Sequence, residues 1–205
     1  SCSTQVHIGD FLEGFPPAED AGVENSPAAQ HANHRRLSDR LVDSMCLAHP
    51  EQQSLQLPHS KLLVSPKIQG KALTELNLSR CERLVDAAVT FIRHGCPVLR
   101  RVRMDYCLAL SAPKLSGHCL ELVSYSGCMR LQDIAVTELC RDAPALQTLC
   151  LCFCVSLEEP VIRGSSLEQV DMQCCRRLSD RAIEQLDVRA LTNLNLFGCV
   201  GLKTP

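Results

Sequence analysis

The chain has 205 residues, with 21 Lys and Arg against 23 Asp and Glu, and therefore a formal net charge of −2. This balance excludes the basic excess that general nucleic-acid binders and anionic-membrane binders need. With 45% hydrophobic and 21% charged residues the composition is that of a globular protein, and no apolar run approaches the roughly 18 residues of a membrane span.

Residues 1–30 are predicted to form an extended or linker-like arm. Phe11 and Phe15 lie in a Pro- and Gly-containing setting, and a stretch rich in Ala, Glu, Asn, Ser and Pro follows them. We expect the two Phe side chains to dock on the edge of the following domain or on a partner. The first residue is Ser and no charged segment followed by an apolar segment comes after it, so we expect no secretory signal.

Internal repeats organise residues 31–205. Six cysteines, here called the anchors, share a pattern in which large apolar residues stand eight, five and three positions earlier and Leu stands three positions later. The anchors are Cys81, Cys107, Cys128, Cys154, Cys175 and Cys199. The alternation before each anchor predicts a short strand with its apolar side chains pointing inward. One such unit cannot bury its apolar residues alone, so we expect the units to stack with parallel strands.

Two further units precede the first anchor. Ser60 occupies the anchor position of one of them, with Gln52 in place of the first Leu. The six residues at 35–40 repeat those at 176–181, which places His34 in the anchor position of the first unit. The strand half of that first unit is degenerate, as suits a terminal repeat with a polar outer face. We therefore expect seven or eight units.

The units alternate between a long and a short form, with anchors 26 and 21 residues apart. The long units predict helices that start at Asp86 and Asp133, whose carboxylates would cap their own helices, and that end before a Pro. The short units place Pro and Gly at fixed positions, in Pro66 to Gly70, Pro113 to Gly117 and Pro160 to Gly164. These residues disfavour a helix, so the short units should return along an extended or turn-rich path.

The chain contains 14 cysteines, and their regular spacing indicates buried, reduced thiols rather than disulfides. We expect each anchor thiol to donate a hydrogen bond to a backbone carbonyl. Reduced thiols also predict an intracellular reducing compartment, the cytoplasm or nucleus, with an organelle or cilium as alternatives. Cys150, Cys152 and Cys154, together with Cys174 and Cys175, invite a zinc interpretation. We expect Cys154 and Cys175 to point into the core of separate units and Cys150 and Cys152 to point outward, so the thiols do not converge on one ion. His94 is the best candidate partner for a reactive thiol, yet a helix end explains it equally well. We therefore predict no cofactor, no metal and no catalytic residue, and keep a zinc or thiol enzyme as an alternative.

The units resemble cysteine-containing leucine-rich repeats, and the segment at 175–186, Cys-Arg-Arg-Leu-Ser-Asp-Arg-Ala-Ile-Glu-Gln-Leu, is very close to that motif. Such repeats are similar to those of F-box/leucine-rich-repeat proteins, the substrate receptors of cullin-RING ubiquitin ligases, and of scaffold subunits that lack an F-box. The resemblance covers about residues 34–202 and implies an α/β leucine-rich-repeat solenoid, or horseshoe, with parallel strands. We find no F-box in residues 1–33, and the short Pro/Gly units depart from the uniform repeat length of the family.

Function is expected on the concave face, because repeat proteins bind partners on this extended surface. Arg and aromatic residues carry much of the binding energy in interfaces. The predicted partner-binding residues are Glu75, Arg101, Arg103, Tyr106, Phe153 and Asp171. The alternative is a solvated polar face with cross-strand charge pairs, each worth about 0–1 kcal/mol.

The C-terminal end of the solenoid is predicted to be uncapped, with nothing stacked over Leu194 and Leu196, so either the protein continues or a neighbour covers this edge. We expect a non-catalytic protein-binding module, such as a ubiquitin-ligase adaptor that binds a ligase subunit or a substrate. The alternative is an architectural scaffold subunit bound to its neighbours in a large assembly. The sequence gives no membrane signal and no strong nucleic-acid signal.

Overall fold

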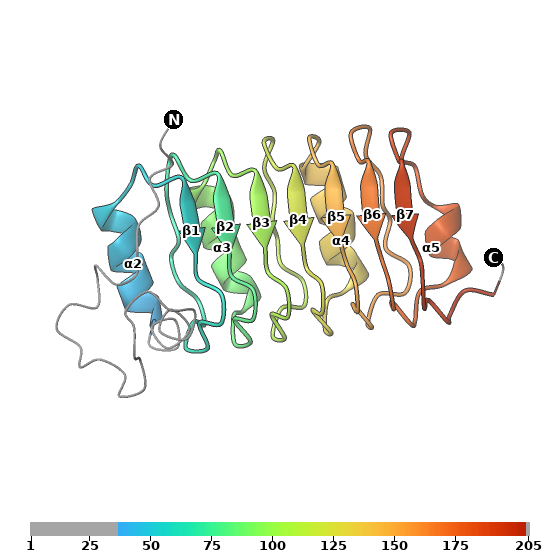
Figure 1. Ribbon diagram of the computed structural model, residues 1–205, viewed down its shortest axis with the longest axis horizontal. Helices are drawn as coiled ribbons and strands as arrows, with labels where there is room; N and C mark the ends of the chain where they lie inside the picture. Colours follow the sequence, from blue (N-terminus) through green and yellow to red (C-terminus); the bar gives the residue numbers. More distant parts are fainter. Residues whose placement is uncertain (1–36, 204–205) are drawn as a thin grey trace, which may run out of the picture.

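The computed structural model describes residues 37–203, which form an α/β solenoid of leucine-rich repeats (Figure 1). Seven short strands lie side by side in chain order, and each pairs in parallel with the next. The strands are β1 (Ser54–Gln56), β2 (Glu75–Asn77), β3 (Arg101–Arg103), β4 (Leu122–Ser124), β5 (Thr148–Cys150), β6 (Gln169–Asp171) and β7 (Asn193–Asn195). The register aligns equivalent repeat positions, so that Leu55, Leu76 and Val102 form one buried column.

The helices lie in alternate units, as predicted. They are α2 (Asp39–Ala48), α3 (Asp86–Gly95), α4 (Asp133–Asp142) and α5 (Asp180–Glu184). Helices α3 and α4 end before Pro97 and Pro144, and both lie behind the sheet in Figure 1. The returns after β1, β3 and β5 contain no helix, which confirms the turn-rich path of the short units. Their residues Pro66, Pro113 and Pro160 are buried.

The anchor thiols lie in the core and connect neighbouring units. Each donates to the carbonyl of the residue three positions before the preceding anchor; the Sγ to O distance is 3.1 Å from Cys128 to Met104 and 3.0 Å from Cys199 to Met172. The other four anchors make the same bond. Ser60, which stands in an anchor position, donates to Leu57 in its own unit. The predicted interior role of the anchors is confirmed.

The aspartates that start the helices do not cap their own helices, so that prediction was wrong. None of the four helices has a side-chain capping bond at its N-terminus. Instead, the Asp86 carboxylate accepts bonds of 3.0 Å from the backbone N–H groups of Ser111 and Ala112, in the following short unit. Asp39, Asp133 and Asp180 reach equivalent N–H groups. The helix N-terminus still favours the negative charge, but the bonds tie each long unit to the next short one.

The chain leaves every strand through the same turn, at the side of the solenoid that we call the exit edge. The residue before each anchor, including Ser60, adopts a left-handed conformation with φ between 57° and 74°: His59, Arg80, Tyr106, Gly127, Phe153, Cys174 and Gly198. This turn directs the anchor side chain inward and the preceding side chain outward. Its backbone N–H donates to the next unit, as from Tyr106 to the Ser126 carbonyl at 2.7 Å.

At the C-terminal end of the array, Leu194 and Leu196 are only half-buried, whereas the equivalent Leu149 and Leu151 are fully buried. The predicted arm at residues 1–30 and the first unit with His34 lie outside the described residues. Among residues 37–203, no helix has the length and apolar character needed to cross a membrane.

Candidate functional site

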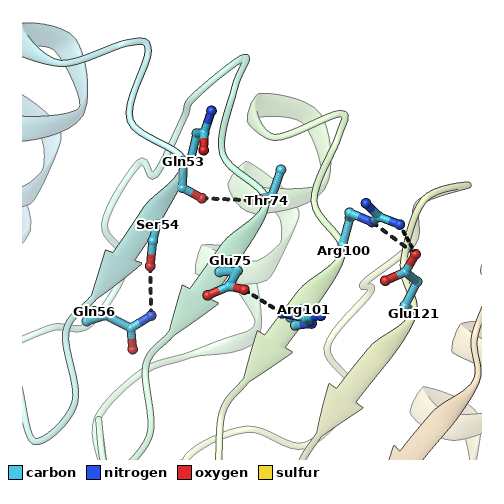
Figure 2. A network of polar contacts seen from close by, with 8 residues as sticks. All are labelled: Gln53, Ser54, Gln56, Thr74, Glu75, Arg100, Arg101 and Glu121. Atoms are coloured by element: carbon cyan, nitrogen blue, oxygen red, sulfur yellow. Dashed lines mark hydrogen bonds and ion pairs between the residues drawn. The ribbon is translucent and has the colours of Figure 1, made fainter. Parts of the chain in front are cut away.

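The side of the sheet opposite the helices, here called the open face, corresponds to the expected concave face. Glu75 of β2 and Arg101 of β3 are register partners on this face. Their side chains form an ion pair, with 2.7 Å between Arg101 Nη1 and Glu75 Oε1, and both side chains are more than 40% exposed. Figure 2 shows this pair beside a second one, Arg100 with Glu121, at the start of the neighbouring strands. Exposed pairs of this kind add little stability, so they are available for exchange with a partner's charges.

Arg103 is exposed on the same strand, between Asn77 and Ser124 in the register. In the described part of the chain, no carboxylate lies within 4 Å of its guanidinium. The nearby Asp105 carboxylate is committed elsewhere, because it accepts bonds from the Ser124 hydroxyl and, at 3.1 Å, from the Ser126 N–H. Arg103 therefore presents on the open face a positive charge that has no ion-pair partner among residues 37–203.

Tyr106 and Phe153 lie at the exit edge rather than on the open face. Both occupy the left-handed position, with φ of 57° and 60°, and their side chains are 36% and 40% exposed. The Arg80 guanidinium lies over the Tyr106 ring, 4.8 Å from its centroid. This distance is within the range of a cation–π contact.

Asp171 lies on β6, three strands away from Arg101. Its carboxylate accepts a 3.0 Å bond from the Gln173 N–H, and it lines a hollow of about 330 Å³ on the open face of β5 to β7. The other eight residues that line this hollow are uncharged, and four of them are polar: Thr148, Gln169, Asn193 and Asn195. The hollow therefore differs in charge from the arginine-bearing surface of β3.

The half-buried thiols of Cys150 and Cys152, near Asp171, have pKa values raised above the ordinary range. Burial, and then the hydrogen bond and charge of Asp171, raise the pKa of Cys152 to about 11. Burial likewise raises the pKa of Cys96, near His94, to about 12, and His94 itself contacts the Thr90 carbonyl at the end of α3. Thiols with raised pKa values stay protonated at neutral pH, which is the poor state for a nucleophile or a metal ligand. In residues 37–203, no three His, Cys, Asp or Glu side chains are placed to hold one metal ion.

The structure thus brings together three of the six predicted partner-binding residues, Glu75, Arg101 and Arg103, on the open face of β2 and β3, while Tyr106 follows β3 at the exit edge. Phe153 and Asp171 belong to units two and three strands further along, about 10 and 14 Å away at the usual strand spacing. The sequence places Tyr106 and Phe153 at the strand exits, and we joined them to the patch predicted for the concave face, whereas the structure places them at the exit edge. The sequence signal for this turn is the glycine directly before two of the anchors, at positions 127 and 198, because glycine favours a left-handed backbone.

No protein-family model matches the chain, and no curated protein matches it. The chain is similar in structure to a chain in the crystal structure of the Rad7 and Elc1 complex of yeast, with a TM-score of 0.61 and 18% sequence identity. The match covers 83% of this chain and 42% of the yeast chain, so the present chain spans less than half the length of that neighbour. At this identity the likeness concerns the fold.

Proposed function

We propose that this chain is a protein-interaction module, which binds a partner protein through its repeat surface and catalyses no reaction. The observation that carries this proposal is the pair of exposed arginines on β3. Among the described residues, Arg101 is held by one exposed ion pair and Arg103 by none. Arginine is enriched among the residues that dominate binding energy. Because the parallel strands already fix the backbone of this surface, binding a partner would not require the entropic cost of ordering that backbone.

Two comparisons support a role in an assembly. The similar yeast chain was crystallised in a complex of two proteins, and the repeats resemble those of F-box/leucine-rich-repeat adaptors. We infer that the partner is a ubiquitin-ligase subunit or a substrate of such a ligase, bound in the cytoplasm or nucleus. The surface that we propose for it comprises Glu75, Arg101 and Arg103, with Tyr106 at its margin.

The test is affinity purification with mass spectrometry, comparing the wild type with an Arg101→Glu/Arg103→Glu variant. Partners that use this surface should be lost from the variant, because two attractive charges become repulsive. The matched control is Arg93→Glu/Lys114→Glu, which changes the net charge equally at exposed positions on the side of the helices and return segments. An identical list of partners for the wild type and the β3 variant would refute the proposed surface.

The second candidate function is that of an architectural subunit, in which neighbours would cover the half-buried Leu194 and Leu196 at β7. An adaptor should be monodisperse when it is purified alone, whereas a subunit with this apolar column covered by neighbours should aggregate without them. Sedimentation velocity separates the two. Zinc at one ion per chain in purified material would instead favour the metalloprotein alternative.

A further inference from the structure

The exit edge presents a row of apolar side chains from three successive units. Tyr106 and Phe153 come directly before their anchors, and Leu108 and Met129 directly after theirs. Their exposed fractions are 36%, 40%, 37% and 49%, respectively. Because the units repeat at the strand spacing, the row from β3 to β5 spans about 10 Å. Large apolar side chains gathered on one surface mark an interaction site more often than scattered ones.

This row is held rigidly by the repeat backbone. The N–H of Phe153 donates to the Gln173 carbonyl at 2.8 Å, in the same way as Tyr106 bonds to the next unit. The Tyr106 ring lies against Gly127, where a Cβ atom would approach Cδ1 of the ring to 2.5 Å. Arg80 covers the ring from the preceding unit. The aromatic surface is therefore preorganised, which lowers the entropic cost of binding.

The rim of the row is positively charged. Arg83 and Arg130 each stand two residues after an anchor position, and both are exposed. Within residues 37–203, neither has a carboxylate within 4 Å. The nearest acidic residue of this turn, Glu82, pairs with Lys61 at 3.3 Å, and Asp105 is turned toward serine and backbone donors. The edge therefore combines an apolar row with unpaired guanidinium groups.

We propose that the exit edge is the docking surface for an acidic protein segment that carries aromatic or aliphatic side chains. Charge complementarity selects the carboxylates of such a segment for Arg83 and Arg130, while its apolar side chains would cover Tyr106, Met129 and Phe153. A single-stranded nucleic acid would satisfy the charges, but the aliphatic members of the row offer no plane for base stacking. The proposal rests on the proposed function as a protein-binding module and names the chemistry of the partner and the surface that receives it.

The experiment measures binding of a fluorescein-labelled copolymer of glutamate and tyrosine to the full chain by fluorescence anisotropy. We expect saturable, salt-sensitive binding that is weakened about tenfold by Arg83→Glu/Arg130→Glu. Phe153→Asn should weaken it several-fold without changing any charge, since Asn tolerates the left-handed backbone while the aromatic contact is lost. Circular dichroism reports whether each variant folds. If the double arginine variant does not fold, the affinity of the Phe153 variant for the copolymer still tests the proposal.

The controls separate this surface from the open face. Arg93→Glu/Lys114→Glu alters the net charge equally and should change the affinity less than about twofold. The inference is overturned by absence of saturable binding, by copolymer binding that both exit-edge variants leave intact, or by tighter binding of an oligothymidylate that these variants abolish. Copolymer binding lost only in Arg101→Glu/Arg103→Glu would also overturn it while leaving the proposed function standing. The proposed function itself is judged by the list of purified partners, which is a separate readout.

Discussion

Raising the pH from 8 to 10 should destabilise the fold through its anchor thiols. Burial raises the pKa of Cys81, Cys128 and Cys175 from the ordinary 9.0 to about 12. The unfolded chain therefore releases these protons near pH 9, while the folded chain keeps them. The contribution to stability is complete below about pH 8 and is lost progressively as the pH rises toward 12.

The size of the effect follows from proton linkage. A thiol that ionises at 9.0 in the unfolded chain and at about 12 in the folded one loses about 1.4 kcal/mol of stabilisation by pH 10. Three such thiols together lose about 4 kcal/mol, a large part of the 5–15 kcal/mol typical of a whole domain. The alkaline side of the stability curve should therefore be unusually steep for a chain of this size.

The assay is urea unfolding at pH 8 and pH 10 in a phosphine reductant, for the wild type and for Cys128→Ser. Serine already fills an anchor position at Ser60, where its hydroxyl donates to a carbonyl at 2.8 Å and does not ionise. The variant should lose about 1.4 kcal/mol less than the wild type between the two pH values. The exposed Cys119, replaced by Ala, is the control. An equal loss in wild type and Cys128→Ser would refute the role assigned to the anchor thiols.

Three further outcomes test the packing. Asp86→Ala should lower the free energy of unfolding by about 2–3 kcal/mol, because the N–H groups of Ser111 and its neighbour lose a charged acceptor; a loss below about 0.5 kcal/mol in urea unfolding would show that the bonds are dispensable. Tyr125→Phe should leave stability unchanged or raise it by about 1 kcal/mol, since the fully buried hydroxyl has no hydrogen-bond partner within residues 37–203; a clear drop in the thermal midpoint would contradict this. Gly127→Ala should cost about 1–2 kcal/mol, because φ is +74° there and the Tyr106 ring fills the space of a Cβ; a higher midpoint would contradict this.

The repeat architecture could be predicted from the sequence because its signal is local. Leucines at fixed distances from each anchor define strand, turn and inward face within about a dozen residues, and Pro97 marks a helix end in the same way. The hydrogen bonds of Asp86 to the next unit could not be predicted in this way. Its bonding partners lie 25 and 26 residues later, and a first-turn aspartate has a plausible local explanation in helix capping.

The candidate site was predicted only in part for a related reason. Glu75 and Arg101 occupy equivalent positions of successive units, so their contact follows from the register alone. Phe153 was predicted as an aromatic member of the patch at a strand exit, and Asp171 as a flank of the patch from its repeat position. In a stacked array, however, distance grows with every intervening unit, and the turn before the anchor rotates Phe153 away from the strand face. A prediction that does not count the intervening strands therefore includes residues that lie too far apart to contact one partner segment.

The alternation of helical and helix-free units restricts how such a chain can change its length. Each helix-free segment is held on both sides: Ser111 binds the carboxylate of the helix before it, and the Gly117 N–H meets the last residue of the helix after it at 3.3 Å. Loss or duplication of one unit would place two units of the same form side by side and leave the Asp86 carboxylate without the N–H groups that donate to it. Growth or shrinkage by one long and one short unit together would preserve every junction. Evolution and engineering of this array should therefore proceed in steps of two.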